Sequence, residues 1–599
     1  MNDTKLQHGA IVRISGPVVG AVDVPNIRLH DLVYVGEERL MGEIIRLNNR
    51  YCTIQVHEET SGVRIGEPVW CSSMPLVVEL GPGLVGQVFD GLQRPLDDLA
   101  ELQGAFLKRG TFISPLGRDK RWDFTPLKKK GDEVGPGCIL GTVQETKMIE
   151  HRIMVPPGKQ GRIVNIRSGK FNVTEPIVTL EVLNNQVHKI SMMQRWPVRV
   201  PRPVSQRIAS YKPLITGTRI IDLFFPVAKG GTAIIPGGFG TGKTATMQSL
   251  ARWSDADIVV YVGCGERGNE MAAVLAEFPN LEDPRSGESL INRTVLIANT
   301  SNMPVAARVA SIYTGITISE YYRDMGYDVV MLADSTSRWG EALREISGRL
   351  EEIPGEEGYP AYLSSRISEF YERAGCVRCL GNSTGSKEKP KELRKGSVSL
   401  IGAVSPPGGD FSEPITQSSM RVAGTFWALD YDLSRRRHFP AINWIQSYSL
   451  YRLQGWFEGI EAEWVRLNKE AMSLLSQEDE LLKVVQLIGK DALSESQQEI
   501  LAVAKMLRED LLQQSALDEN DRYSPLKKSF WMMKNIMDFH KLTLRALEAD
   551  IALDRILKMP IVAEIGRMKE IPIKDVIIQL KSMNKQIYIS FSEISIRIE

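Results

Sequence analysis

The sequence has few cysteines, no net charge and no long apolar run. Six cysteines lie scattered over 599 residues, which predicts reduced thiols, and the single C-x-x-C pattern, Cys376 to Cys379, lacks the second pair typical of a zinc site. Lysine plus arginine (73) equals aspartate plus glutamate (73), which argues against a nucleic-acid-coating surface. No apolar stretch approaches the roughly 18 residues that span a bilayer, and residues 1–5 lack the apolar core of a signal peptide. These absences predict a cytoplasmic globular chain that binds no nucleic acid.

Eight residues in the middle of the chain fit the phosphate-binding pattern G-x-x-x-x-G-K-[ST]. They are Gly237, Gly238, Phe239, Gly240, Thr241, Gly242, Lys243 and Thr244. The pattern needs a strand before it and a helix after it, and the apolar run 232–235 and the proline- and glycine-free stretch 243–253 predict both. Backbone N–H groups would then meet a phosphate at a helix N-terminus, with Lys243 on the β- and γ-phosphates and Thr244 on Mg²⁺. The alternative is a glycine-rich turn without a ligand.

The length and the apolar pattern predict a multidomain protein, since a prior of about 150 residues per domain suggests about four domains. Short Val- and Ile-rich runs predict a β-barrel and a second all-β module, and apolar runs alternating with helical segments predict a parallel sheet flanked by helices. Helical periodicity follows, opened by the capping-box pattern Ser496-x-x-Glu499. The expected parts are an N-terminal β-barrel (1–75), a connection to the core (76–110), an inserted β domain (111–195), an α/β P-loop, RecA-like nucleotide-binding domain (196–450) and a C-terminal helical domain (451–599).

Two carboxylates follow predicted strands. Asp334 ends the apolar run 329–333, which places it at the carboxyl edge of a strand, where Mg²⁺-binding carboxylates of this fold class lie. Its alternative role is to cap the next helix. Glu266 and Arg267 follow the run 258–262, so the glutamate could polarise water while the arginine faces phosphate; the alternative is a solvated turn with a local ion pair. The basic run 435–438 is interpreted as a solvated face in preference to an anion site.

With these motifs the chain closely resembles the catalytic A subunits of the V-type and archaeal A-type rotary ATPases, called alpha chains in bacteria. The likeness extends over nearly the whole sequence. The matching stretches are the phosphate loop, DADIVVYVGCGERGNEM at 255–271, ADSTSRW at 333–339, SPPGGDFSEP at 405–414 and RRHFPAINW at 436–444. Residues 111–195 look like the extra β domain that distinguishes A subunits from the F-type β and V-type B subunits.

The resemblance implies ATP or ADP with Mg²⁺ as ligands and a role for each site residue. Lys243 would contact the β- and γ-phosphates, Thr244 and Asp334 would hold Mg²⁺, Glu266 would orient the attacking water, and Arg267 would lie near the γ-phosphate. The aromatic that stacks on adenine matches Phe439.

The resemblance also implies partners. The family forms an alternating A3B3 ring in which a B-type subunit supplies an arginine finger, and the ring joins central and peripheral stalk subunits. Contact with the membrane would be indirect, through the ion-translocating sector. The acidic turn 477–480 would touch the central stalk; a solvated turn is the alternative.

Three positions depart from the family pattern. Gly238 stands where proline is usual, which should loosen the loop. Leu511 and Leu517 stand where relatives commonly carry phenylalanine near the adenine, so adenine stacking would depend more on Phe439. No role is assigned to residues 550–599.

Two other functions compete with a catalytic rotary subunit. One is a non-catalytic nucleotide-binding assembly subunit, and the other is a related hexameric export or translocase ATPase. Whether the machine makes or consumes ATP, and whether it moves protons or sodium ions, is left open.

Overall fold

The computed structural model describes residues 8–104, 108–182, 186–381, 394–489 and 492–596, so the N-terminal residues 1–5 discussed above lie outside it. Two units divide the chain, and each is described by itself. The first comprises Met1–Ser210, Lys229–Thr232 and Ala256–Val422, and the second comprises Tyr211–Ala228, Ala233–Asp255 and Ala423–Glu599.

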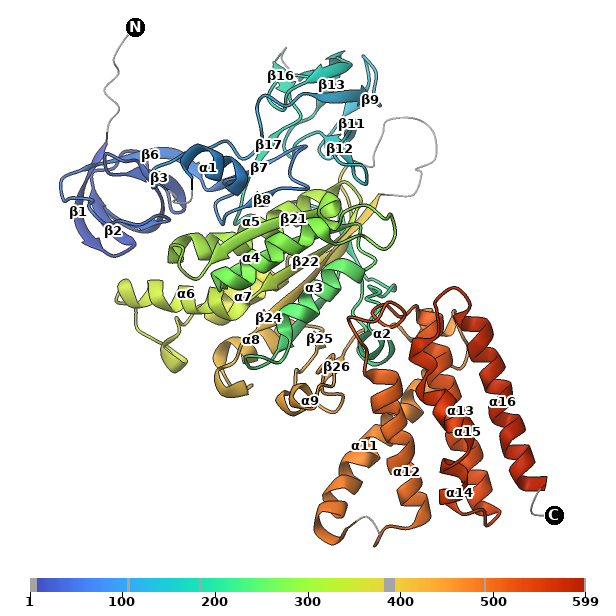
Figure 1. The fold of residues 1–599 in the computed structure, drawn as a ribbon. Coiled ribbons are helices and arrows are strands. Elements are labelled where there is room, and N and C mark those ends of the chain that lie inside the picture. The colour runs from blue at the N-terminus through green and yellow to red at the C-terminus, as the bar shows by residue number, and fades with distance from the viewer. Residues whose placement is uncertain (1–7, 105–107, 183–185, 382–393, 490–491, 597–599) are drawn as a thin grey trace. The chain divides into compact units, whose positions relative to one another are not determined.

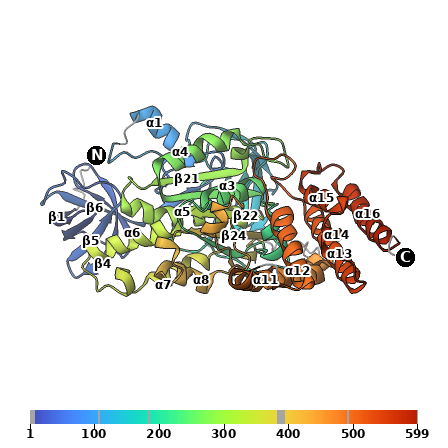
Figure 2. The same cartoon turned by 60° about the horizontal axis from the view of Figure 1, so that its bottom comes forward.

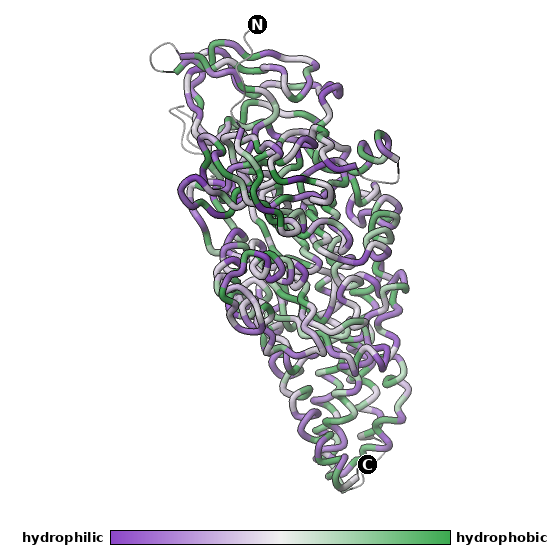
Figure 3. The backbone as a smooth tube through the Cα atoms, turned by 90° about the vertical axis from the view of Figure 1, so that its left-hand side faces the viewer, coloured by the Kyte–Doolittle hydropathy of each residue, from purple (hydrophilic) through white to green (hydrophobic). Residues whose placement is uncertain are grey.

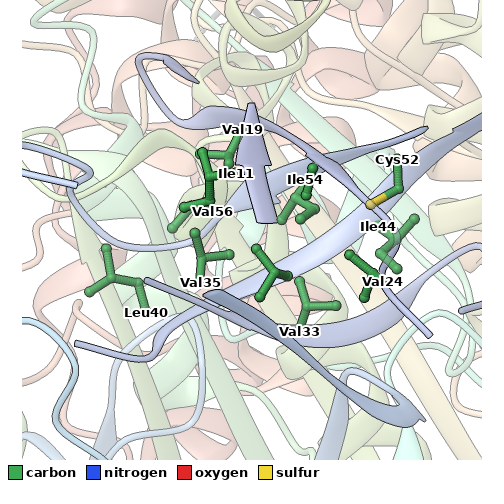
Figure 4. Packing of buried hydrophobic residues seen from close by; sticks show 12 residues of the cluster. Ile11, Val19, Val24, Val33, Val35, Leu40, Ile44, Cys52, Ile54 and Val56 are labelled. Carbon is green, nitrogen blue, oxygen red and sulfur yellow. The ribbon is translucent and has the colours of Figure 1, made fainter. Parts of the chain in front are cut away.

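The first unit begins with the predicted closed β-barrel (Figure 1). Its strands are antiparallel in the order β1-β2-β5-β4-β3-β6. They are β1 (Gly9–Ser15), β2 (Val18–Val22), β3 (Asp31–Val35), β4 (Leu40–Asn48), β5 (Tyr51–Val56) and β6 (Pro68–Pro75). Small branched side chains such as Val19, Val33, Ile44 and Ile54 fill the interior and are fully buried (Figure 4). The expected barrel is therefore confirmed. Its strand β6 was not predicted, because its sequence is not rich in Val or Ile.

The next part of the first unit is all-β, as expected. It contains two four-stranded sheets, in the orders β10-β13-β15-β16 and β12-β11-β9-β14. The strands are β9 (Trp122–Pro126), β10 (Glu133–Val134), β11 (Ile139–Gln144), β12 (Glu150–Met154), β13 (Gly161–Ile166), β14 (Gly169–Phe171), β15 (Val178–Glu181) and β16 (Val187–Ile190). Before and after this part, β7 (Val77–Leu80) pairs with β17 (Gln194–Pro197), which brings the two ends of the insertion together.

A buried carboxylate fastens this insertion to the rest of the first unit. Glu145 accepts hydrogen bonds from the backbone N–H groups of residues 83–85, at 2.7 to 3.1 Å, and from the hydroxyl of Tyr322 at 3.0 Å. Its other oxygen lies 2.6 Å from Nδ1 of His151, which is also fully buried. Although burial acts to raise it, the charge of His151 and the N–H donors lower the pKa of Glu145.

A parallel sheet completes the first unit, with the strand order β24-β22-β20-β21-β8. The strands are β8 (Val88–Phe89), β20 (Ile258–Glu266), β21 (Thr294–Thr300), β22 (Asp328–Asp334) and β24 (Lys395–Val404), and β23 (Gly375–Arg378) extends the sheet antiparallel between β24 and β18 (Gln206–Ile208). The helices of this region are α4 (Gly268–Glu277), α5 (Val305–Asp324), α6 (Thr336–Arg349), α7 (Leu363–Tyr371) and α8 (Pro414–Val422), with α1 (Leu96–Gln103) before them. Because α4, α5 and α6 all pack on β20, its near-continuous Val-rich run is buried. The expected alternation of strands and helices is confirmed.

The second unit holds β19 (Thr232–Pro236) from Ala233 onward, which pairs with β25 (Thr425–Phe426), and β26 (Tyr448–Ser449) beyond it. Its helices are α2 (Arg219–Phe224), α3 (Lys243–Trp253), α9 (Tyr431–Arg435), α10 (Gln454–Glu458), α11 (Trp464–Ile488), α12 (Glu495–Met506), a π-helical turn (Leu507–Leu512), α13 (Leu526–Glu548), α14 (Leu553–Leu557), α15 (Pro560–Gly566) and α16 (Val576–Ile596). Figure 2 shows α11 to α16 as the helical end of the chain, and in Figure 3 hydrophobic and hydrophilic residues alternate along it. The predicted helical C-terminus is confirmed.

Two local predictions in this helical part are wrong. The capping box is formed by Ser494 and Gln497, because the Ser494 hydroxyl accepts the Gln497 N–H (3.3 Å) and Gln497 Oε1 accepts the Ser494 N–H (3.0 Å). Ser496 therefore lies within the first turn of α12, and Glu499 is buried and bonded to His540 at 2.7 Å.

The acidic residues 477–480 form no turn, since they lie inside α11. Glu478 is only 3% exposed and accepts a hydrogen bond from Arg508 Nε at 3.0 Å, so part of this acidic run packs against the π-helical turn. The run of charged residues in the sequence did not indicate that Glu478 is buried against Arg508.

A buried arginine joins α2 to the same turn. The guanidinium of Arg219 is fully buried, donates to the carbonyls of Leu511 and Gln513, and pairs with Asp521 at 2.5 Å. Its backbone N–H donates to the side chain of Gln514 at 2.8 Å. The guanidinium nitrogens of Arg219 thus have acceptors in the turn and in the segment that follows it, as a buried charge requires.

Candidate functional site

The phosphate loop connects β19 directly to α3, as the sequence predicts. Gly240 and Gly242 have φ values of +80° and +89°, a left-handed conformation that side chains rarely adopt, and Gly242 is the N-cap residue of α3. The N–H groups of the first turn of α3 therefore lack intrahelical acceptors and face the loop end of the helix, where partial positive charge favours an anion.

Lys243 and Thr244 occupy this first turn. The ammonium group of Lys243 donates to the carbonyl oxygens of Gly237 and Gly238, at 2.7 and 2.9 Å, so it lies over the loop that a phosphate would enter. Thr241 closes the same turn by donating its hydroxyl to Gly238 at 2.8 Å. The half-buried Thr244 hydroxyl makes no hydrogen bond within the part of the chain that the structure describes, which suits an oxygen donor for Mg²⁺.

Gly238 is a glycine that the backbone does not require. Its φ is not positive, and a Cβ atom built on it would meet no atom within 4 Å. A side chain at this position would therefore fit, which agrees with the proline that is usual here in the family pattern.

An aromatic ring lies beside the loop in the same unit. A Cβ atom built on Gly242 would lie 3.6 Å from the ring of Phe439, which is 42% exposed. The backbone carbonyl of Phe439 accepts the N–H of Gln514 at 2.8 Å, so the 511–517 segment reaches this ring. Leu511 is fully buried, whereas Leu517 is 96% exposed. The structure thus brings the loop and Phe439 together and leaves only Leu517 of the two leucines accessible to a base.

The first unit carries the two carboxylates at one edge of its sheet. Asp334 is the last residue of β22 and only 2% exposed, and Glu266 is the last residue of β20. Gly263 is paired with Asp334 in the parallel register, so Glu266 lies three residues further along the neighbouring strand. The N-cap residue of α6 is Ser335, whose side chain makes no capping hydrogen bond.

The surroundings of Glu266 raise its pKa. Burial raises the pKa of Glu266 to about 7, and the negative charge of Asp334 contributes to the same rise. A carboxyl group with a pKa near neutrality can both accept and return a proton at physiological pH, which suits acid–base chemistry. Arg267 is the N-cap residue of α4 and is exposed beside Glu266.

Two neighbours of the carboxylates were missed by sequence reasoning. Tyr261 donates its buried hydroxyl to Asp334 at 3.1 Å, and its signal is a lone hydroxyl within an otherwise apolar buried strand. Arg338, on the first turn of α6, acts to lower the pKa of Glu266 and pairs with Glu341 at 2.8 Å. Its place four residues after Asp334 could have indicated that it faces the same edge.

The basic run 435–438 ends α9 and leads to Phe439. The ring of His438 lies 2.9 Å from the carbonyl of Arg508, and the carbonyl of Arg437 accepts from Gln513 at 3.2 Å. These contacts hold the segment to the π-helical turn.

Among the described residues, no group of three or more His, Cys, Asp or Glu side chains could hold a metal ion. None of the described helices is long and apolar enough to cross a membrane.

The predicted site residues thus form two groups, one in each unit. The loop with Phe439 belongs to the second unit, and Glu266, Arg267 and Asp334 belong to the first. Their convergence on one nucleotide stays a prediction. A phosphate loop between a strand and a helix, with acidic side chains at the carboxyl ends of parallel strands, is typical of P-loop nucleotide-binding proteins.

Comparison with known proteins agrees with this class. The family model of the ATP synthase alpha/beta nucleotide-binding domain matches residues 217–449. Its β-barrel domain matches residues 11–71, its barrel-sandwich domain residues 113–199, and the C-terminal domain of V- and A-type ATP synthases residues 454–557.

Similar full-length proteins point to one branch of that family. The chain is 54% identical to the A subunit of the A-type ATP synthase of Methanopyrus kandleri, over 98% of each chain, and 56% identical to that of Thermococcus kodakarensis, over 94% and 95%. It is 53% identical to the V-type ATP synthase alpha chain of Acetivibrio thermocellus over 95% of each. The assembled ATPase EscN of an E. coli type III secretion system matches with a TM-score of 0.61, over 88% of this chain and 99% of that one, but at 19% identity this likeness shows the fold alone. The chain belongs to the ATP synthase alpha/beta family and, within it, to the branch formed by the A subunits, or alpha chains, of the A- and V-type enzymes.

Proposed function

We propose that this chain is the catalytic subunit of a V/A-type rotary ATPase, which hydrolyses or synthesises ATP while protons or sodium ions cross a membrane. The observation that carries the catalytic role is the pair of carboxyl groups at one sheet edge, the half-buried Glu266 with its raised pKa and the buried Asp334. A nucleotide site that serves assembly alone has no need for a water-orienting carboxylate, so this pair disfavours the non-catalytic alternative.

The second unit would bind the nucleotide. The N–H groups at the start of α3 and the ammonium of Lys243 would hold the β- and γ-phosphates, and the ring of Phe439 would stack on adenine. Thr244 and Asp334 would hold Mg²⁺, which neutralises charge on the phosphate oxygens when it is bound. Adenine stacking would depend on Phe439 because Leu511 is buried.

The first unit would supply the groups that act on water. During hydrolysis Glu266 would accept a hydrogen bond from the attacking water and hold its proton as the water oxygen bonds to the γ-phosphorus. The bond from that phosphorus to the β–γ bridging oxygen breaks, its electron pair leaves with ADP, and the proton passes to phosphate. Arg267 would lie against the γ-phosphate and balance its charge. Synthesis would follow the same steps in reverse.

We infer a place for the chain in a larger assembly, because its relatives are named as subunits of ATP synthases. Three copies would alternate with three B-type subunits, and a neighbouring B-type subunit would supply an arginine finger at each site. Central and peripheral stalk subunits would connect the ring to a membrane sector, so this chain would lie at the cytoplasmic side and touch the membrane only indirectly. Alone, it should hydrolyse ATP slowly.

Two substitutions test the division of roles. Glu266→Gln should leave ADP binding nearly unchanged and abolish turnover in the reconstituted ring, whereas Lys243→Ala should weaken binding itself. Glu277→Gln, at the exposed end of α4, is the matched control and should alter neither. Normal turnover with Glu266→Gln, or full affinity with Lys243→Ala, would refute the assignment. Copurification of an equal amount of a B-type partner, with ATPase activity only in the mixture, would establish the assembly and exclude an export ATPase whose ring contains a single kind of chain.

A further inference from the structure

A basic cavity lies between the outer face of the barrel and the C-terminal end of α6, within the first unit. Its volume is about 270 Å³, which is room for about nine water molecules. Three arginines line it, Arg13 and Arg46 from the barrel and Arg349 from α6, together with Tyr51 and one carboxylate, Glu351. None of these residues belongs to the phosphate loop or to the carboxylate edge of the sheet.

The strand register explains why this part of the barrel surface is hollow. Four positions lie directly opposite one another across β1, β2, β5 and β4, namely Arg13, Gly20, Thr53 and Arg46. Because Cys52 and Ile54 point into the barrel core, the side chain of Thr53 between them points outward. The row therefore has a long basic side chain at each end and a glycine and a threonine in the middle.

The distance between the two ends fits a ligand of several atoms. Neighbouring strands lie about 4.8 Å apart, so the backbones of Arg13 and Arg46 are separated by about 14 Å. A guanidinium on a flexible stem can reach inward from either end of such a span. The ring of Tyr51 covers the bottom of the hollow, since a Cβ atom built on Gly20 would collide with its hydroxyl at 2.2 Å.

The end of α6 closes the hollow from the other side. A Cβ atom built on Gly16 would lie 2.5 Å from a guanidinium nitrogen of Arg349, so this side chain lies against the β1–β2 turn. Arg349 also pairs with Glu345 at 3.0 Å, and Arg13 donates to Glu351 at 2.7 Å. For Arg46 there is no ion pair within the residues that the structure describes. Among the charged residues that line the cavity, three guanidinium groups thus face one carboxylate.

We propose that this cavity binds a diphosphate group, either free or as part of a nucleotide. Guanidinium groups are weakly hydrated and bind the oxygens of phosphate and carboxylate groups through paired N–H groups. A single phosphate would contact one end of the row, whereas a diphosphate spans the space between the two basic ends. The exposed positions of Arg13 and Arg46 let such a ligand enter from solvent.

Isothermal titration with pyrophosphate tests the proposal in the full chain. Lys243→Ala serves as the host, because it weakens the phosphate loop without touching the cavity. We expect one pyrophosphate to bind per chain in this host, and the affinity to fall at least tenfold when Arg46→Ala is added. Arg46→Lys, which keeps the charge but loses the paired donors, should recover only part of that loss. Arg50→Ala is the control, since Arg50 lies in the same barrel, is 88% exposed in its side chain and does not line the cavity.

The outcomes separate this site from its alternatives. No binding in the Lys243→Ala host would overturn the proposal. Equal binding with and without Arg46 would overturn it as well. Titration with ADP identifies the source of the diphosphate, because tighter binding of ADP than of pyrophosphate indicates a nucleotide and the reverse order indicates the free anion. The Arg46 and Arg50 variants change exposed side chains, whose replacement usually alters stability little, so folding does not obscure the comparison between them.

Discussion

Glu43→Gln should destabilise the barrel at neutral pH and progressively less in acid. Glu43 lies on β4, is 1% exposed, and accepts hydrogen bonds from Arg199 Nε at 2.7 Å and Nη2 at 2.8 Å. Nδ1 of His30 lies 2.6 Å from the same carboxylate, and burial lowers the pKa of the nearby His57. Although burial acts to raise it, the charge of Arg199 and these hydrogen bonds lower the pKa of Glu43 to about 2.

The size of the effect follows from that pKa. A fall from the ordinary value of 4.5 to about 2 corresponds to roughly 3 kcal/mol, since one pKa unit is about 1.4 kcal/mol. Because the folded-state pKa is depressed, this stabilisation is fully present above pH 4.5 and is lost as the pH falls toward 2. By the same relation, about 1.4 kcal/mol should remain at pH 3.

Hydrogen exchange of the backbone amides of β4 and β5 measures this difference. Local exchange is suitable because a chain with several cores does not unfold in one two-state step. Wild type and Glu43→Gln should differ by about 3 kcal/mol in opening free energy at pH 7 and by less than half of that at pH 3. Glu37→Gln, at an exposed position of the same barrel, should change exchange by less than about 0.5 kcal/mol. A gap that stays constant from pH 7 to pH 3, or one below about 1 kcal/mol at pH 7, would refute the reasoning.

Four other substitutions test contacts described above. Arg219→Met should cost about 3 to 5 kcal/mol in the opening of the π-helical turn, measured by hydrogen exchange, because it leaves a buried carboxylate unpaired, while the partly exposed Arg522→Met should cost under about 1 kcal/mol. Glu145→Gln should speed proteolysis of the inserted β domain, because removing a charged acceptor costs about 1 to 3 kcal/mol, and unchanged cleavage would contradict its anchoring role. Phe439→Ala should weaken ADP binding by about 1 to 3 kcal/mol in calorimetry, the usual loss for a stacked base. Leu517→Phe should tighten ADP binding several-fold without changing thermal unfolding, and weaker binding would exclude this residue from the base site.

Much of the fold was predictable because long buried strands leave continuous apolar runs. Residues 243–253 form a helix with the predicted bounds, and the runs beginning near Ile258 and Val329 are strands of a parallel sheet. The strand β8 has only two residues and therefore leaves no such run. It is recognised as a strand only because it pairs with the neighbouring β21. Both Ser494 and Ser496 precede a suitable acceptor by three residues, so only the backbone geometry shows which of them is the cap.

In the candidate site, features formed by neighbouring residues in the sequence could be predicted, whereas contacts between residues far apart in the sequence could not. The phosphate loop could be predicted because all its determinants, from the apolar run 232–235 to the helical stretch 243–253, lie close together in the sequence. The bond from Tyr261 to Asp334, in contrast, joins residues 73 positions apart and depends on strand register, which local patterns do not specify. The predicted roles of Lys243, Glu266 and Asp334 and the domain boundaries remain predictions.

Helix α6 starts next to Asp334 and finishes at the barrel surface. Its 14 residues make a rod about 21 Å long, and a helix of that length moves as one piece. A small tilt imposed at Arg338 when the local charge changes would therefore displace Arg349 and the contact between Glu351 and Arg13. We expect the position of the barrel side chains that contact Arg349 and Glu351 to change when the charge near Asp334, at the start of this helix, changes.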